Sequence, residues 1–181
     1  MKTRRVFLAS GIFFACIAIF FLVVPSAKYV VYRHLPVEVR RQISFSLSEK
    51  FLIGMIYFVE QDGELLLVKH NYQERWGLPG GWLSKDETPM QCAKRELKEE
   101  LGASVVAVEL FELRKPANSN VVDIAVVCKI NSEDFHVDNS EISEFKFFPG
   151  DSLPEEILYT HKPYIDRYLE TRNGQPVQQI N

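Results

Sequence analysis

The sequence itself marks both ends of one helix. Thr88 suits an N-cap position, Pro89 suits the first helical position, and Gln91 completes a capping box with Thr88. Gly102 is the type of residue favoured just past a helix C-terminus. We therefore predict a helix from Thr88 to about Leu101.

Two stripes of different chemistry run along this predicted helix. At about 100° per residue, one stripe is apolar and is expected to face a core; it consists of Met90, Ala93, Leu97 and Leu101. Three carboxylates converge along its edge: those of Glu96, Glu99 and Glu100. Like charges three or four residues apart each cost a helix about 0.2–0.5 kcal/mol. The helix dipole also disfavours negative charge in the last turns.

Two interpretations of the acidic edge are open. The first is a solvated charged face, neutralised by Lys94, Arg95 and Lys98. The second is a site for a divalent cation, because Mg²⁺ and Mn²⁺ prefer several carboxylate oxygens and would offset the repulsion. Only the second explains why the carboxylates are clustered.

The residues around this helix have strand patterns. The apolar run 51–59, the turn EQDGE and the run LLLVKH predict a hairpin, and a loop rich in glycine and proline is expected to follow it. Further strands are expected at about 103–114, 121–130 and 144–149. Ser152 and Glu155 predict the start of a last helix, which Pro163 would kink or break. The pattern indicates an α/β fold, a mixed sheet covered by helices.

The N-terminal part has a different character. Residues 6–24 are nineteen residues without a charge, close to the roughly 20 that a helix needs to cross a bilayer. We interpret residues 1–27 as a single-pass transmembrane anchor; an uncleaved or twin-arginine export signal is the alternative. Residues 28–50 form a basic amphipathic linker, suited either to an anionic leaflet or to solvent. Basic residues flank the span almost equally, so a cytoplasmic catalytic domain is favoured only mildly.

Charge and cysteine content exclude some functions. Residues 1–50 carry eight basic and two acidic residues, whereas the remainder carries 13 basic and 22 acidic residues. An acidic body does not suit nucleic-acid binding. The three cysteines, Cys16, Cys92 and Cys128, lack the spacing of a disulfide framework.

One segment resembles a known signature. Gly81, Glu87 and the run Arg95-Glu96-Leu97-Lys98-Glu99-Glu100-Leu101-Gly102 are similar to the conserved box of the Nudix hydrolases. Ala103 is the one departure, at a packing position where the family has a larger aliphatic residue. The resemblance covers about residues 51–169 and implies an α/β/α sandwich. We place the Nudix domain at 51–172 and a frayed tail at 173–181.

The resemblance also implies roles for individual residues. Metal ligands would be Glu96, Glu99 and Glu100, with Glu141 as an added carboxylate and Glu144 as second choice for it. Glu96 or Glu99 would act in catalysis, Arg95 would hold a glutamate through a bidentate ion pair, and Glu87 would support the junction between loop and helix. Gly80, Gly81, Arg75 and Trp76 are expected to contact substrate. Tyr72, Trp76 and Trp82 are candidates to stack on a base, or else structural aromatics.

The implied activity is Mg²⁺-dependent hydrolysis of the pyrophosphate bond in a nucleoside diphosphate linked to another group, with Mn²⁺ as a possible substitute. Nucleotide sugars, ADP-ribose and nucleoside triphosphates are all open as substrates. A nucleotide-sensing domain without activity is the alternative, disfavoured because every box carboxylate is present. An isomerase is a third reading, disfavoured because no cysteine–glutamate site stands out. Membrane lipid is the expected partner of residues 6–24, and a dimer is open.

Overall fold

The computed structural model describes residues 26–131, 135, 137 and 141–172, and the chain divides into two compact units at Lys50 and Phe51. The first unit contains α2 (Ala27–His34) and α3 (Val37–Leu47). They are joined by a hydrogen bond of 2.9 Å between the hydroxyls of Tyr32 and Ser44. Within the described residues, no helix is both long and apolar enough to cross a bilayer. The predicted span, residues 6–24, and the predicted tail, 173–181, lie outside the described residues.

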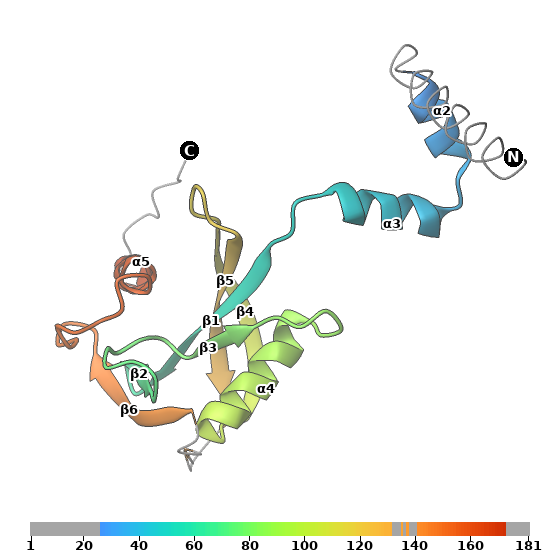
Figure 1. The fold of residues 1–181 in the computed structure, drawn as a ribbon. Coiled ribbons are helices and arrows are strands. Elements are labelled where there is room, and N and C mark those ends of the chain that lie inside the picture. The colour runs from blue at the N-terminus through green and yellow to red at the C-terminus, as the bar shows by residue number, and fades with distance from the viewer. Residues whose placement is uncertain (1–25, 132–134, 136, 138–140, 173–181) are drawn as a thin grey trace, which may run out of the picture. The chain divides into compact units, whose positions relative to one another are not determined.

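The second unit is built on a mixed sheet (Figure 1). Its strands are β1 (Leu52–Gln61), β2 (Glu64–His70), β3 (Gly80–Trp82), β4 (Val105–Arg114), β5 (Val121–Ile130) and β6 (Ile142–Pro149). The order is β4-β5-β1-β2-β6, with β3 paired to β1. The β1–β5 pairing is parallel and the others are antiparallel. The predicted hairpin is confirmed, and its turn has positive φ at both Asp62 and Gly63.

Alternating side chains of the central strands build two cores, one on each face of the sheet. Met55, Tyr57 and Val59 of β1 pack with α4 (Pro89–Leu101). Ile56 and Phe58 pack instead with α5 (Lys162–Arg172). Because successive strand residues point to opposite faces, one strand serves both cores. The predicted α/β/α arrangement is therefore present.

Helix α4 has the predicted ends. Thr88 and Gln91 form a complete capping box, and Gly102 ends the helix in the left-handed conformation, with φ of 68°. Ala93, Leu97 and Leu101 are fully buried on the sheet, as predicted for the apolar stripe. Ala103, the departure from the family pattern, is itself buried in the same core.

Two expectations about secondary structure were wrong. The last helix does not begin at Ser152: residues 151–161 form turns and one bridge, and α5 begins at Lys162. Pro163 consequently lies in the first turn, where its missing N–H costs nothing. The loop expected after β2 contains the short strand β3, which its glycines concealed because they carry no strand propensity.

Candidate active site

The acidic edge of α4 lies beside β3 and β1, and its three glutamates differ greatly in exposure. Glu100 is 2% exposed, and the side chains of Glu96 and Glu99 are 12% and 56% exposed. The three side chains therefore form a gradient from core to solvent along one edge. A ligand at this edge would meet carboxylates held at different depths.

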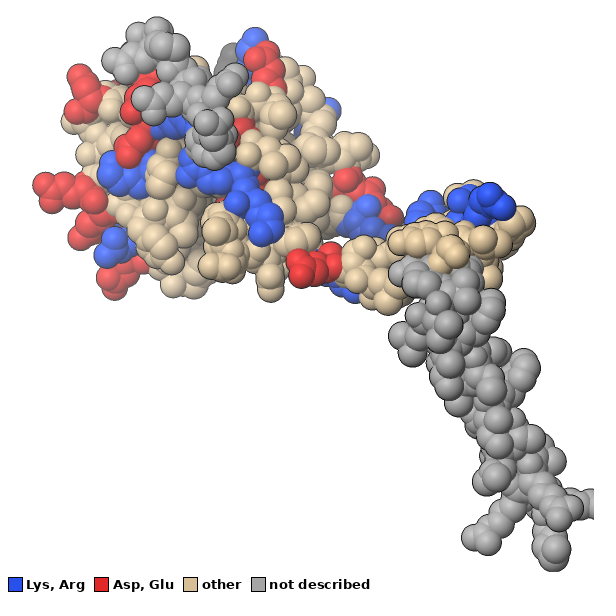
Figure 2. All heavy atoms as spheres, turned by 90° about the horizontal axis from the view of Figure 1, so that it is seen from above, with Lys and Arg blue, Asp and Glu red and all other residues tan. Residues whose placement is uncertain are grey.

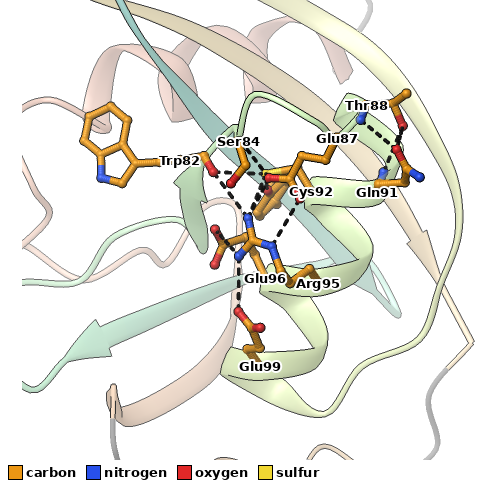
Figure 3. Close-up of polar contacts among 10 residues, drawn as sticks. Trp82, Ser84, Glu87, Thr88, Gln91, Cys92, Arg95, Glu96 and Glu99 are labelled. Carbon is orange, nitrogen blue, oxygen red and sulfur yellow. Dashed lines mark hydrogen bonds and ion pairs between the residues drawn. The ribbon is translucent and has the colours of Figure 1, made fainter.

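Arg95 is the centre of the ion-pair network shown in Figure 3. Its Nη2 and Nε contact the two oxygens of Glu87, at 2.7 and 3.2 Å. This is the bidentate pair predicted from the sequence. Its Nη1 contacts Glu96 at 2.8 Å and Glu99 at 3.2 Å. Glu87 also accepts a bond from the Ser84 backbone N–H, so it ties the loop to the helix.

The two glycines before the helix let the backbone approach this network. Gly80 and Gly81 lie on β3 opposite Ile56 and Met55 of β1. A Cβ on Gly81 would overlap the carboxyl group of Glu96. Glycine is thus required at position 81 for Glu96 to keep its place.

Glu100 meets a histidine that the sequence did not single out. Oε1 of Glu100 lies 3.3 Å from Nε2 of His70, the last residue of β2. Nδ1 of His70 lies 2.9 Å from Nε2 of Gln73. Oε2 of Glu100 is buried and has no hydrogen-bond partner in the described part of the chain.

Burial and mutual repulsion shape the electrostatics of the edge. Burial raises the pKa of Glu100, with repulsion from Glu96 as a smaller cause. Burial likewise raises the pKa of Glu96, and repulsion from Glu99 and Glu141 adds to it against the attraction of Arg95. Hydrogen bonds from Arg95 and the Ser84 backbone lower the pKa of Glu87 to about 2. The carboxylate of Glu87 is therefore stabilised in its charged form, whereas those of Glu96 and Glu100 are buried next to other carboxylates.

Glu141 belongs to the same electrostatic cluster, whereas Glu144 does not. Repulsion from Glu141 acts on Glu96 and on the Tyr72 hydroxyl. The pKa of that hydroxyl is raised by its own partial burial, although the residue as a whole is largely exposed, and also by Glu100. The Glu141 carbonyl accepts a bond from the Asn71 backbone N–H, which holds it near the end of β2. Glu144 pairs with Lys69 at 3.4 Å instead.

The donor set fits a hard divalent cation. Across the residues that the structure describes, no group of three His, Cys, Asp or Glu side chains is already arranged around a common point. Nη1 of Arg95 contacts both Glu96 and Glu99. A buried carboxylate oxygen without a partner on Glu100, beside these two, is the feature a cation would satisfy.

The predicted substrate residues lie in different environments. Trp76 is 7% exposed and packs edge-on against Phe148, with Lys69 over its ring, which favours the structural role that the sequence left open. Arg75 is exposed in the loop before β3. Trp82 is 55% exposed, and its indole extends away from Glu96 and Glu99 in Figure 3.

Tyr72 is the aromatic residue placed next to the acidic edge. It is 79% exposed, and its ring lies 5.0 Å from that of His70. It borders an open depression of about 600 Å³, lined by Lys69, His70, Asn71, Tyr72, Gln73, Glu74, Ser143 and Glu144. Strands β2 and β6 and the loop after β2 form this depression.

The sequence analysis missed His70, Gln73 and His161. His161 is partly buried, and its Nδ1 accepts a bond from the Leu78 backbone N–H at 2.9 Å. Burial lowers its pKa to about 4. In the sequence, His70 is marked only by its position at the end of an apolar strand. That position does not show which helix packs against the strand.

Comparisons with known proteins agree with this geometry. The family described as NUDIX domain matches residues 52–168. A MutT-like protein of Streptomyces ambofaciens is 31% identical, over 64% of this chain and 73% of its own length. An ADP-ribose pyrophosphatase of Methanocaldococcus jannaschii is 27% identical, over 64% and 72%. The crystal structure of a NUDIX hydrolase from Nitrosomonas europaea superimposes with a TM-score of 0.61 at 26% identity, covering 73% of this chain and 78% of that one.

The family match spans more than half of the chain, so the protein belongs to the NUDIX family. Several relatives are named as pyrophosphatases, and with the family match this defines the chain as a Nudix-type pyrophosphohydrolase. Proteins of this family act on nucleotide-type substrates.

Proposed function

We propose that the protein hydrolyses the pyrophosphate bond of a nucleoside diphosphate linked to another group, with Mg²⁺ as cofactor and Mn²⁺ as a possible substitute. The observation that carries this proposal is the buried, unpartnered Oε2 of Glu100 beside Glu96 and Glu99. When bound, the cation would neutralise charge on the phosphate oxygens. Its ligands would come from Glu96, Glu99, Glu100 and Glu141.

The side chains and backbone of the protein would position the substrate and accept the proton of the attacking water. Gly80 and Gly81 bring backbone close to the carboxylates, and Arg95 with Glu87 fixes the start of the helix against the loop. A carboxylate of the edge accepts the proton of the attacking water, and Glu96 or Glu99 is the candidate that the sequence provides. The product phosphates would leave toward solvent on the Glu99 side, where the edge is most exposed.

The nucleoside end is proposed to lie in the depression against Tyr72. Its ring is exposed, borders the depression and lies 5.0 Å from the ring of His70, which contacts Glu100. Stacking on such a ring contributes about 1–3 kcal/mol for a base and tolerates any base. This arrangement suits nucleotide sugars, ADP-ribose and nucleoside triphosphates alike.

The test is formation of nucleoside monophosphate, measured by ion-exchange chromatography, from a panel of nucleotides and nucleotide sugars. Activity with Mg²⁺ that disappears with EDTA and returns with added Mg²⁺ supports the proposal. Tyr72→Ala should raise KM several-fold for the best substrate, whereas the same substitution at exposed Tyr159 serves as the control. A chain that binds nucleotides but forms no nucleoside monophosphate from any of them would support the sensing alternative instead.

We further propose that residues 6–24 anchor the protein in a membrane. The neighbouring residues 26–50 expose apolar side chains, among them Tyr29, Phe45 and Leu47, between basic ones. In Figure 2, blue basic and tan side chains share the visible surface of this part. Fractionation of cells, with salt and detergent washes, tests the anchor; release by salt alone would contradict it.

A further inference from the structure

The strand end at His70 and the loop after it contact Glu100, although neither belongs to the family signature. His70 and Glu100 are 9% and 2% exposed, and their side chains meet at 3.3 Å. Gln73 reaches the other ring nitrogen of His70 at 2.9 Å. The three side chains form a chain of hydrogen bonds from the loop to the helix.

The chemistry of glutamine fixes the direction of these bonds. The contacting atom of Gln73 is its amide nitrogen, which can only donate. Nδ1 of His70 must then accept, so the ring hydrogen is on Nε2 and points at Oε1 of Glu100. The ring of Tyr72 lies across His70, at 32° to its plane, and limits its rotation.

This bond leaves the two oxygens of Glu100 in different states. Oε1 has a donor, while Oε2 is equally buried and has none among the described residues. A buried carboxylate oxygen without a partner is unfavourable, because it has lost its hydration and has gained no donor in exchange. The hydrogen bond to Oε1 also fixes the torsion that sets where Oε2 points.

From this arrangement we propose that His70, oriented by Gln73, is a positioning residue that holds Glu100 so that Oε2 is presented to the cation. The inference rests on the proposed function, because it assumes that Glu100 is a metal ligand. Partners of this kind commonly tune metal sites by a factor of about 10–100 in affinity. The alternative is that His70 only satisfies a buried carboxyl group and contributes to stability.

Direct Mn²⁺ binding separates these roles. Free Mn²⁺ is measured by electron paramagnetic resonance in titrations of the purified full-length chain without substrate. His70→Phe keeps a flat ring but has no N–H, and it should weaken Mn²⁺ binding about 10- to 100-fold. His70→Gln can place a donor near the position of Nε2 and should restore part of the affinity. Glu109→Gln, at an exposed carboxylate of β4 outside the site, should bind like wild type.

Each outcome decides a different claim. Wild-type affinity in His70→Phe, together with weak binding in Glu100→Gln, would overturn the positioning role and leave the metal site intact. Wild-type affinity in Glu100→Gln would overturn both the positioning role and the assignment of Glu100. Near-UV circular dichroism of each variant shows whether the binding protein is folded.

The hydrogen on the ring of His70 gives a second measurement. Nitrogen chemical shifts of labelled, metal-free protein should show the Nε2–H form of His70, and Gln73→Leu should reduce this preference. Gln73→Leu should also weaken Mn²⁺ binding, by less than His70→Phe, because His70 keeps its contact with Glu100. A ring protonated on Nδ1 in the wild type would contradict the proposed direction of the bonds.

Discussion

Both faces of the sheet bury carboxylates, but the two faces differ in how many positive groups meet them. On the α5 face, Oε1 of Glu112 contacts Arg114 at 3.0 Å and Arg167 at 3.5 Å, and Asp123 accepts a bond from the Tyr164 hydroxyl. On the α4 face, the edge formed by Glu96, Glu99 and Glu100, with Glu141 nearby, is opposed by one guanidinium group, that of Arg95, and by N–H groups of His70 and of the Gly80 backbone.

This difference shows what distinguishes a site from a structural network. One oxygen of Glu112 also lacks a hydrogen bond, but its other oxygen meets two guanidinium groups. The partner of Glu100 is a histidine that donates one hydrogen. A buried carboxylate alone therefore does not identify a functional site. A functional site is indicated where the carboxylates outnumber the positive groups that face them.

The largest effect is expected from Glu100→Gln. Loss of the charge should lower kcat by about 10²–10⁴, because several kcal/mol of transition-state stabilisation depend on the cation that it would hold. Stability without metal should not fall, since burial already raises the pKa of this carboxyl and glutamine can still accept from His70. Steady-state kinetics and urea unfolding with EDTA measure the two effects.

Glu109→Gln is the control for that substitution, because Glu109 is exposed and pairs with Lys129 outside the acidic cluster. Its kcat should stay within a few-fold of wild type. Near-normal turnover in Glu100→Gln would remove this residue from the site.

Gly81→Ala is expected to have the next largest effect. The added methyl group would overlap the carboxyl of Glu96 and push it from its place. Displacing a catalytic group by about 1 Å can cost roughly 100-fold in rate. The measurement is kcat with saturating Mg²⁺, and Gly150→Ala is the control, because its methyl would meet only a flexible end of Leu169. A Gly81→Ala enzyme with full activity would show that Glu96 can move without cost.

The sequence predicted local features well because their causes are local. The ends of α4 follow from Thr88, Gln91 and Gly102, and the hairpin turn follows from Asp62 and Gly63. Arg95 also makes the expected bidentate pair with a glutamate, and the structure identifies that glutamate as Glu87. In each case, residues within eight positions of one another determine the structure.

Contacts between distant segments could not be predicted in this way. His70 faces Glu100 only because β2 is next to β1, and β1 lies under α4. Leu78 meets His161 because the segment before α5 returns to the loop before β3. Ser152 satisfied a local rule for a helix start, but its segment instead pairs with Trp76 and the helix begins ten residues later. Tertiary contacts override propensity there.

Glu112→Gln makes the same change as Glu100→Gln, but on the α5 face of the sheet. It should lower stability and leave turnover almost unchanged. It weakens the contacts with Arg114 and Arg167, so the free energy of unfolding should fall by about 3 kcal/mol. The value of kcat should change little, because this network lies on the far side of the sheet. Urea unfolding and kinetics at one temperature measure both. A large loss of turnover in folded protein would mean that the two faces are coupled.

The smallest effect concerns His161, whose stabilising role should depend on pH. Its pKa is about 4 in the folded protein, below the usual value of about 6.5, because burial disfavours the charged ring. As the pH falls below about 6.5, the unfolded chain takes up a proton that the folded chain does not. Stability is therefore fully present above that pH and is lost toward pH 4, by about 1.4 kcal/mol per pH unit. In His161→Asn, the amide oxygen can still accept from Leu78, but nothing titrates. Urea unfolding across this range should show a difference between the two proteins that grows as the pH falls, and parallel curves would assign the pH dependence to another group.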